Sequence, residues 1–232
     1  MKIIGHRGAA GLALENTLSS IRTALHAGVD VIEIDIRLTK DLHFVLSHDP
    51  SLRRVGGNSA RISSLTLQEI QQIRLNNGEK PPTLRQAYHE ANGQALFIEA
   101  KGNSWASTLA DEIKHIPYTN ISVIAMNHAE LAVFHALAPD VPTFAVQHFK
   151  ESEFFSTLRA AIRNSFTGID LNFWQLNPLT YWLAKKYRLQ IVVYTVNHIW
   201  LARFVSWLFP DVSITTNHPE KLQFLRKPQS NR

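Results

Sequence analysis

Short apolar runs alternate with longer amphipathic stretches from one end of the chain to the other. The short runs predict β-strands at residues 3–5, 31–36, 44–46, 95–100, 121–125, 142–146, 167–171, 191–196 and 212–215. The longer stretches carry apolar residues near helical spacing and predict α-helices at residues 17–27, 67–74, 84–91, 105–115, 128–137, 151–164, 178–186 and 199–208. Strands that alternate with helices in this way are typical of an α/β fold.

The third apolar run, at residues 44–46, cannot be a parallel neighbour of the strand before it. Only residues 38–43 lie between the two, whereas a parallel crossover needs roughly a dozen residues. We therefore expect a sharp turn that folds this run back as a hairpin arm. The eight remaining strands predict a TIM-type (β/α)8 barrel with a short hairpin arm after strand 2. An open doubly wound sheet is the alternative, but the chain has no glycine-rich nucleotide loop to support it.

The composition is that of a globular protein with a sizeable core. Hydrophobic residues make up 45% and charged residues 19% of the 232 residues. Barrels of about 200–250 residues commonly fold as one unit, so we expect residues 1–232 to form a single barrel domain. The chain contains no cysteine, which excludes disulfides, thiolate metal sites and thiol nucleophiles. Any metal must therefore bind to oxygen or imidazole ligands.

The N-terminal residues and the net charge lead to predictions of the cellular location and the binding partners of the protein. An apolar run of three residues is followed at once by His6 and Arg7, which leaves no room for a signal peptide and predicts a cytoplasmic protein. No apolar stretch approaches the roughly 18 residues of a spanning helix, so we expect no stable membrane insertion. The net charge of +5 would suit an anionic substrate or a membrane surface, although a modest excess like this is more often solvated lysine and arginine. No basic run interleaved with aromatics appears, so no nucleic-acid partner is expected, and the oligomeric state stays open.

Acidic side chains occur on two of the predicted strands. In the run at residues 31–36, the two-residue period of a strand places Glu33 and Asp35 on one face and three isoleucines on the other. Since the isoleucines meet the helices, the carboxylates point into the barrel, near the strand ends where barrel enzymes keep their chemistry. Glu99 and Lys101 share a face of another strand in the same way. Three oxygen donors beside each other predict one divalent cation, Mg²⁺ or Ca²⁺.

An idle, solvent-exposed polar face is the competing explanation for such carboxylates. A strand in a parallel barrel is buried on both sides and has no solvent face. The carboxylates are therefore better explained as part of a functional site. Two histidines are expected nearby, because His6 ends the first strand together with Arg7 and His48 ends the hairpin arm together with Asp49. One histidine alone is more commonly structural. The whole set suits general acid and base catalysis on an anionic ester.

At this point the sequence resembles the glycerophosphodiester phosphodiesterase family. The motifs that carry the resemblance are GHRG at 5–8, ENT at 15–17, GVDVIEIDIRLTKD at 28–41, SHDP at 47–50, PTL at 82–84, FIEAK at 97–101, YTVN at 194–197 and ITTNHP at 214–219. Several separate motifs in one order are far more specific than any single pattern. The first hundred residues match in order and spacing, and the remainder matches more loosely.

The resemblance implies a role for each of seven residues: metal ligands Glu33, Asp35 and Glu99, an acid and a base in His6 and His48, and phosphate-binding groups in Arg7 and Lys101. It implies hydrolysis of glycerophosphodiesters to an alcohol and sn-glycerol 3-phosphate, within lipid and glycerol metabolism. Which histidine is the acid stays open. It further implies a small insertion on the barrel rim at about residues 50–80, so Gly56 and Gly57 are interpreted as loop residues.

The chain departs from the family pattern at four positions. Leu14 stands where proline is usual, and Leu42 stands where a turn glycine is usual, so we expect a rearranged turn there. Asn217 replaces an acid at the end of the last strand, which removes a negative charge near the barrel mouth. Tyr194 stands where a tryptophan is common and is expected to alter the pocket wall.

Two further functions stay open beside the main one. The same site would also serve a lysophospholipase D that cleaves a larger diester, and an apolar groove leading to the metal would favour it. A barrel that only binds phosphodiesters is less consistent with the sequence, because binding needs no pair of histidines. Asn16 and Thr17 are interpreted as the N-cap of the first helix. Aromatic side chains are interpreted as core rather than as a lipid groove at Phe144, Phe149, Phe154, Phe155, Phe173 and Trp174.

Overall fold

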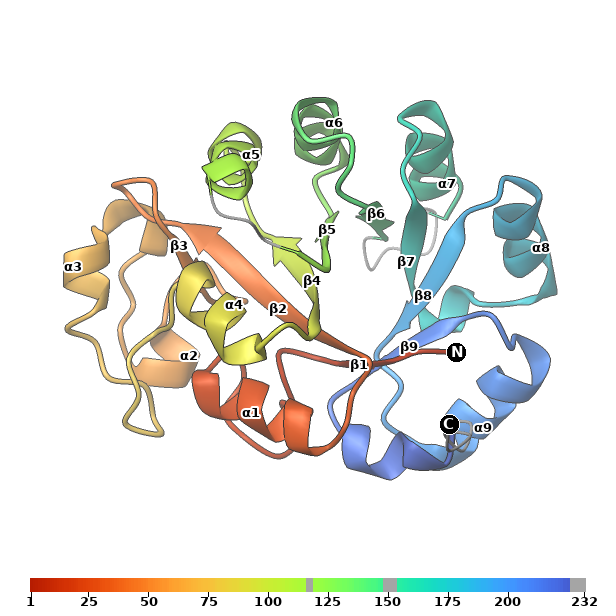
Figure 1. Ribbon diagram of the computed structural model, residues 1–232, viewed down its shortest axis with the longest axis horizontal. Coiled ribbons are helices and arrows are strands. Elements are labelled where there is room, and N and C mark those ends of the chain that lie inside the picture. Colours follow the sequence, from red (N-terminus) through yellow and green to blue (C-terminus); the bar gives the residue numbers. More distant parts are fainter. Residues whose placement is uncertain (116–118, 148–153, 226–232) are drawn as a thin grey trace.

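A closed sheet of parallel strands forms the centre of the molecule (Figure 1). The computed structural model describes residues 1–115, 119–147 and 154–225. Within this part, the strands follow the order β1-β9-β8-β7-β6-β5-β4-β2-β3, and an additional β1–β2 pairing closes the barrel. Their bounds are β1 Ile3–Gly5, β2 Val31–Leu38, β3 Phe44–Leu46, β4 Ala95–Ala100, β5 Ile121–Ala125, β6 Thr143–Val146, β7 Gly168–Asn172, β8 Gln190–Tyr194 and β9 Ser213–Thr216. The predicted TIM-type (β/α)8 barrel is confirmed.

Helices surround the barrel in an outer ring. Their bounds are α1 Leu18–His26, α2 Arg53–Gly56, α3 Leu67–Ile70, α4 Leu84–Ala91, α5 Ala106–His115, α6 His128–Leu137, α7 Phe154–Arg163, α8 Pro178–Lys186 and α9 Ile199–Leu208, with 3₁₀ turns η1 Ile62–Ser64, η3 Phe173–Gln175 and η4 Pro219–Leu225. The predicted helices occur, but the one expected at 67–74 ends at Ile70. The chain turns there because Ile70, Ile73 and Leu75 pack into a local core. Of the helix expected at 151–164, residues 151–153 lie outside the described residues.

Side chains of alternate strand residues form two cores, one on each side of the sheet. Ile32, Ile34 and Ile36 of β2 pack outward against the helices, within the larger core. Val31 of the same strand points into the barrel, where it joins an inner cluster that includes Phe97. Because the side chains of a strand alternate, Glu33 and Asp35 share the inward side with Val31, as the sequence predicts.

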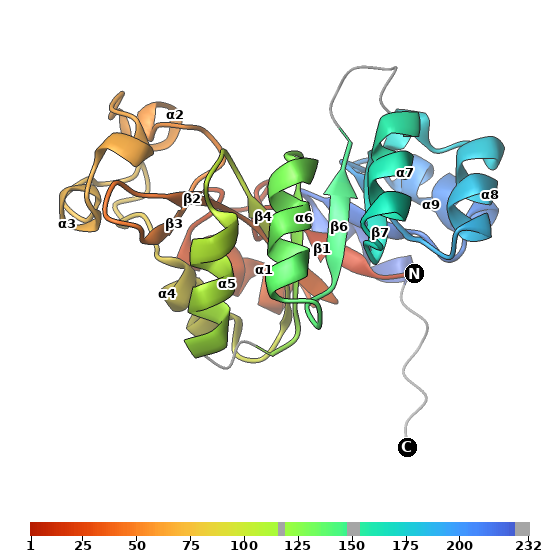
Figure 2. The same ribbon diagram turned by 90° about the horizontal axis from the view of Figure 1, so that it is seen from above.

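The expected hairpin arm is also confirmed. Strand β3 is antiparallel to β2, with Ile36 opposite Leu46 and Leu38 opposite Phe44. Beyond it, the residues of the predicted rim insertion hold α2, η1 and α3, beside the arm (Figure 2). These short elements pack on a small core of their own, which consists of Val45, Leu52, Ile62, Ile70 and Leu75. The arm and this segment therefore stand at one side of the barrel mouth.

The turn between β2 and β3 places Leu42 in a backbone conformation that is unfavourable for leucine. Leu42 has φ +63° and an exposed side chain, and its N–H donates to the carbonyl of Thr39 at 3.2 Å. This left-handed conformation is the one that favours glycine. Leu42 therefore holds a strained backbone conformation in this turn, and the expected rearrangement of the turn relative to the family stays a prediction.

We predict that Leu42→Gly stabilises the protein by about 0.5–1 kcal/mol. Relief of the left-handed strain, about 1–2 kcal/mol, exceeds the extra entropy that glycine gives the unfolded chain. Urea unfolding measures the difference, and Leu42→Ala is the matched control because it keeps the same strain. A glycine variant less stable than the alanine variant would contradict the prediction.

Candidate active site

Three buried carboxylates meet at the mouth of the barrel, where β2 and β4 end. The parallel register sets Asp35 beside Glu99, and Glu33 lies two residues before Asp35 on the same side of the sheet. One oxygen of each carboxylate lies within 4.8 Å of those of the other two, and all three side chains are buried. The structure thus brings together the trio that strand alternation predicts.

Two cations and a backbone N–H compensate this concentration of negative charge. Arg7 Nε lies 3.3 Å from Asp35 Oδ2, and Lys101 Nζ lies 3.1 Å from Asp35 Oδ1 and 2.5 Å from Glu99 Oε1. The backbone N–H of Arg7 donates to Glu33 Oε2 at 2.7 Å. Two positive charges thus face three carboxylates, which leaves the cluster with an excess of acid.

The three carboxylates differ in how easily they ionise. Burial, reinforced by the charges of Asp35 and Glu99, raises the pKa of Glu33 well above its usual value. Burial also raises the pKa of Glu99. Although burial opposes it, the neighbouring Lys101 and Arg7 lower the pKa of Asp35. Among the described residues, buried Glu33 Oε1 has no hydrogen-bond partner, so the cluster fits a divalent cation that would bind this oxygen and favour ionisation.

His6 lies beside this cluster with one nitrogen fixed. Its Nδ1 lies 2.6 Å from the amide oxygen of Asn217, and its Nε2 lies 4.0 Å from Glu33 Oε2. An amide oxygen only accepts hydrogen bonds, so Nδ1 carries the hydrogen and Nε2 is free to take a proton. Burial, together with the positive charge of Arg7, lowers the pKa of His6 to about 4. The ring is therefore neutral at neutral pH.

His48 faces the pocket from the end of the hairpin arm. Its Nδ1 lies 2.8 Å from Asp49 Oδ1, so a carboxylate orients the ring. The guanidinium of Arg37 donates to the backbone carbonyl of His48 at 2.6 and 3.0 Å, which fixes the main chain. The two histidines thus differ in their partners, because His6 faces a neutral amide and His48 faces an acid.

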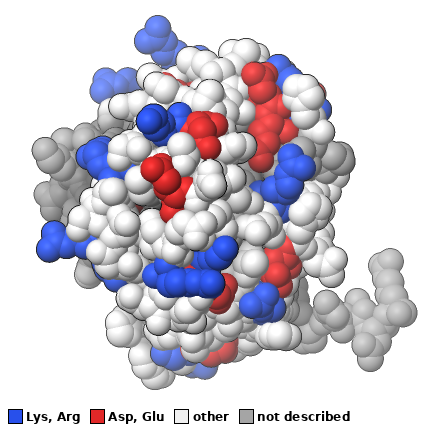
Figure 3. Space-filling model, turned by 90° about the vertical axis from the view of Figure 1, so that its left-hand side faces the viewer, with Lys and Arg blue, Asp and Glu red and all other residues white. Residues whose placement is uncertain are grey.

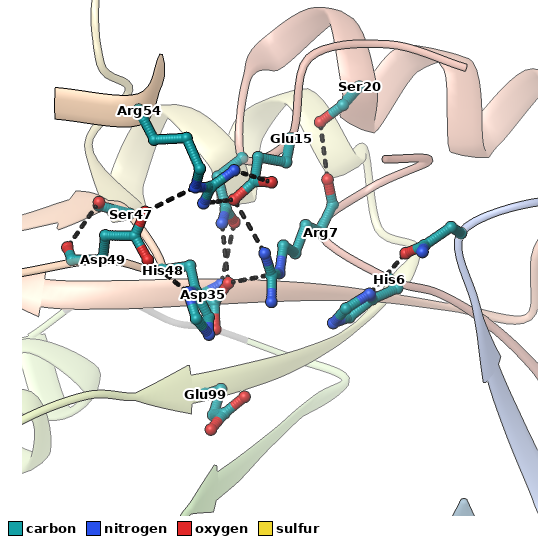
Figure 4. A network of polar contacts seen from close by, with 12 residues as sticks. His6, Arg7, Glu15, Ser20, Asp35, Ser47, His48, Asp49, Arg54 and Glu99 are labelled. Carbon is teal, nitrogen blue, oxygen red and sulfur yellow. Dashed lines mark hydrogen bonds and ion pairs between the residues drawn. The ribbon is translucent and has the colours of Figure 1, made fainter. Parts of the chain in front are cut away.

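An ion-pair network joins the hairpin arm to the first strand (Figure 4). Arg54 donates to Asp49 at 2.7 Å and to both oxygens of Glu15 at 2.7 Å. Glu15 in turn accepts from Arg7 at 2.9 Å. Sequence reasoning missed Arg54 and Glu15, because they are separated by 39 positions and only the fold brings them together.

The role predicted for Asn16 is wrong, whereas that of Thr17 is confirmed. Thr17 caps α1 by accepting the N–H of Ser20. Asn16 instead has φ +55° and its side-chain amide donates to Asp35 Oδ2 at 2.8 Å, while its amide oxygen accepts the backbone N–H of Asp35 at 3.0 Å. Asn16 therefore orients a carboxylate of the cluster, a contact for which its position before a helix gives no signal.

Two of the three carboxylates, Glu33 and Glu99, and both histidines line a cavity of about 350 Å³. Its polar side holds His6, Arg7, Glu33, His48, Glu99 and Lys101, and its apolar side holds Ile124, Met126, Val146, Phe173 and Trp174.

Asp170 also lines the cavity, and burial raises the pKa of this residue well above its usual value. Sequence reasoning missed Asp170, although strand alternation in β7 could have placed it inward like Glu33. Tyr194 stands in the pocket wall, as expected, and donates to the backbone carbonyl of Gln147 at 2.5 Å.

The prediction that the aromatic side chains lie in the core is confirmed for some and wrong for others. Phe144 and Phe154 are buried, but Phe155 and Trp174 are exposed. Trp174 lies on η3, at the lip of the cavity, where the turn holds its ring out from the barrel. Phe149 lies outside the described residues. The described part of the chain contains no helix with the length and apolarity that crossing a bilayer requires.

Comparison with known proteins points to one family. A family model described as the glycerophosphoryl diester phosphodiesterase family matches residues 6–221. YhdW of Bacillus subtilis, a glycerophosphodiester phosphodiesterase by name, is 29% identical and the alignment covers 95% of this chain and 96% of that protein. A shorter match, 44% identical, covers 30% of this chain and 22% of the human protein called lysophospholipase D GDPD1.

Solved structures agree in fold. A phosphodiesterase from Oleispira antarctica, determined in complex with the product sn-glycerol-3-phosphate, superposes with a TM-score of 0.87 at 22% identity, covering 97% of this chain and 96% of that one. A glycerophosphodiester phosphodiesterase from Thermotoga maritima superposes with a TM-score of 0.82 at 23% identity, covering 97% and 98%. At these identities, the superpositions show a shared barrel.

We predict that Asn217→Asp raises the pKa of His6 by about 1–2 units. A carboxylate beside Nδ1 favours the imidazolium more strongly than the native amide oxygen does, because it carries a full negative charge. Titration of the His6 ring protons by NMR measures the shift, and Asn217→Ala, which removes the acceptor, is expected to give no increase. An unchanged pKa of His6 in the aspartate variant would show that Asn217 does not control this ring.

Proposed function

Because the chain belongs to the glycerophosphoryl diester phosphodiesterase family, we propose that it hydrolyses glycerophosphodiesters to an alcohol and sn-glycerol 3-phosphate at the mouth of its barrel. The observation that carries this proposal is the composition of one cavity. Glu33, Glu99, two histidines, an arginine and a lysine line it together, and Asp35 lies buried beside Glu33 and Glu99. A phosphodiester carries a negative charge, and this set can bind that charge and move protons on both sides of the phosphorus.

Glu33, Asp35 and Glu99 would hold one divalent cation. Carboxylate oxygens are ligands of hard cations, so Mg²⁺ or Ca²⁺ is the expected ion. When bound, such a cation neutralises charge on the phosphoryl oxygens and lowers the barrier to attack. The free oxygen of Glu33 and the excess of acid over Arg7 and Lys101 support this assignment.

The environments of the two histidines favour different roles. His6 is the base in this proposal, since its Nδ1 donates to Asn217 and its unprotonated Nε2 is left to accept a proton in the cavity. His48 is the acid, because Asp49 is a partner that suits a ring carrying the proton it gives away. His6 would take the proton of the attacking oxygen, and His48 would protonate the leaving alcohol.

Arg7 and Lys101 would bind the phosphate. Both line the cavity and both already contact carboxylates of the cluster. A guanidinium and an ammonium in this position can donate to phosphoryl oxygens while they stay paired with Asp35. Glu15 and Arg54 keep the Arg7 side chain in place, so they are positioning residues.

A lysophospholipid is the second candidate substrate. One wall of the cavity is apolar, from Met126 and Val146 to Phe173 and Trp174. Such a wall would accept part of an acyl chain beside the phosphate. A barrel that only binds diesters is disfavoured, because His6 and His48 both face the cavity. A cytoplasmic location and a role in lipid and glycerol metabolism stay predictions.

We predict that Glu33→Gln lowers hydrolysis of glycerophosphocholine by at least about a thousandfold, because the amide no longer offers an anionic ligand. A coupled assay for glycerol 3-phosphate measures turnover, with and without chelator and with each cation restored. Calorimetry gives an independent readout. Since the pKa of Glu33 is raised, cation binding to the wild type should release a proton, and this release should disappear in the variant.

The matched control is Asp140→Asn, which likewise replaces a carboxylate by an amide, but at an exposed position. It is expected to keep wild-type turnover and cation binding. Full activity of Glu33→Gln, or turnover that a chelator does not affect, would refute the proposed metal site.

We predict that His48→Ala and His6→Ala each lower turnover by about 10²–10⁴-fold, but that only His48→Ala is rescued by a substrate with a p-nitrophenol leaving group. Such a group departs without a proton, so it replaces the acid but not the base. Rescue of His6→Ala instead would reverse the two roles. Loss of cation binding in His48→Ala would make His48 a ligand rather than an acid.

A further inference from the structure

An exposed face of aromatic and cationic side chains covers the outer side of α8 and α9. Four of the five tryptophans in the chain lie between Trp174 and Trp207. Trp200 and Trp207 of α9 are each 78% exposed, and Trp182 of α8 is 55% exposed. Tryptophans are usually largely buried, so this degree of exposure on two neighbouring helices is unusual. We call this surface the aromatic face.

The spacing along α9 shows that these side chains form one continuous stripe. Trp200, Phe204, Trp207 and Leu208 follow each other at helical spacing and are exposed, whereas Ala202 and Val205 are buried on the opposite side of the helix. The face of α9 that carries Ala202 and Val205 therefore packs against the barrel. The aromatic stripe faces outward, where it can contact solvent or a partner.

Helix α8 lies beside α9 and extends the same surface, as Figures 1 and 2 show from two directions. The ring of Tyr181 lies 5.1 Å from that of Phe209, and Lys185 Nζ lies 3.0 Å from Asp211 Oδ2. These two contacts join the far end of α8 to the residues that follow α9. Trp182 is thus an exposed aromatic residue on the helix that packs next to the one carrying the stripe.

Positive charge predominates on this surface, where the acid at its edge, Asp211, pairs with Lys185. Residues 171–210 contain no aspartate or glutamate but include Lys185, Lys186, Arg188 and Arg203. The cations lie on the aromatic rings themselves: Arg203 is 5.4 Å from the ring of Trp200, and Lys186 is 5.2 Å from that of Trp182. Figure 3 faces the other side of the molecule, where acidic and basic side chains are intermixed.

The apolar surface continues to the lip of the active-site cavity. Trp174 lines that cavity and is itself 78% exposed. Leu179 and Ile199 are exposed as well, near the first residues of α8 and α9. Helices of this barrel begin at the carboxyl ends of the strands, so these residues stand at the same end as the catalytic cavity.

We propose that the aromatic face docks on the surface of an anionic lipid bilayer. Tryptophan rings favour the boundary between headgroups and acyl chains, and lysine or arginine beside them binds anionic headgroups. The helices are far too short to span a bilayer, so the contact is peripheral. Docking would bring the cavity lip at Trp174 to the lipid surface.

A second copy of the chain fits this surface less well. A symmetric dimer through the aromatic face would set Arg203 and Lys186 against their own equivalents, with no acid between residues 171 and 210 to pair with them. A nucleic acid would engage the cations but would leave Phe204 and Leu208 without an apolar partner. An anionic bilayer satisfies both the charge and the apolar area.

Co-sedimentation with vesicles tests the proposal on the full-length protein. Wild type should bind phosphatidylcholine vesicles that contain phosphatidylglycerol, and added salt should weaken the binding. Binding should fall by more than about tenfold when Trp200→Ser and Trp207→Ser are combined, because two large apolar side chains no longer insert. Arg203→Glu with Lys186→Glu should abolish the preference for the anionic lipid.

Matched controls distinguish vesicle binding through the aromatic face from non-specific adsorption and from effects on catalysis. Val133→Ser removes an exposed apolar side chain on α6, and Lys114→Glu reverses an exposed charge on α5; both should bind vesicles like wild type. The tryptophan variants should keep their melting temperature and their turnover of soluble glycerophosphocholine. Glu33→Gln should bind vesicles normally, so failure of the proposed catalysis would not affect this readout.

Three results would overturn the proposal. The first is absence of binding to phosphatidylglycerol vesicles at low salt. The second is an equal loss of binding in the control and tryptophan variants. The third is a dimer in solution that Trp200→Ser with Trp207→Ser dissociates, together with no vesicle binding by the wild type, which would assign the face to a second copy of the chain.

Discussion

The architecture of the barrel mouth depends on the repulsion between three carboxylates that the fold buries together. Glu33, Asp35 and Glu99 cannot all ionise there without positive charge close by. Arg7 and Lys101 supply part of it and hold Asp35 ionised, while the pKa values of Glu33 and Glu99 remain raised. The remaining excess of acid is what makes the cluster suited to a cation and, through it, to a phosphodiester.

The hairpin arm and the rim segment extend this electrostatic arrangement beyond the barrel itself. The arm carries His48 and Asp49 to the mouth, and Arg54 of the rim segment links Asp49 to Glu15. Glu15 in turn contacts Arg7. A barrel of eight strands alone would hold the carboxylates, but the second histidine reaches the cavity only because β3 folds back along β2.

The two sides of the molecule are built differently. The side of the hairpin arm carries intermixed charges and the network that orients His48 (Figures 3 and 4). The side of α8 and α9 carries exposed aromatic rings with cations on them. Trp174 both lines the cavity and is exposed to solvent, so it links the proposed lipid contact with the proposed chemistry.

The sequence by itself determined the barrel, the hairpin arm and the inward-facing carboxylates. These features follow from local rules, since the two-residue period of a strand fixes the side on which Glu33 and Asp35 lie, and a short link forbids a parallel crossover. The motif resemblance added the histidines and the phosphate-binding cations. Asp170 was within reach of the same strand rule.

Only the tertiary structure decided the contacts between residues distant in sequence. His6 meets Asn217 across 211 positions, and Asn16 orients Asp35 instead of capping its helix. The exposure of Trp174 and Phe155 was also set by the fold, because a helix pattern shows which residues share a face but not which face the barrel covers. Partners and exposure depend on what packs opposite a residue, and a linear sequence does not contain that information.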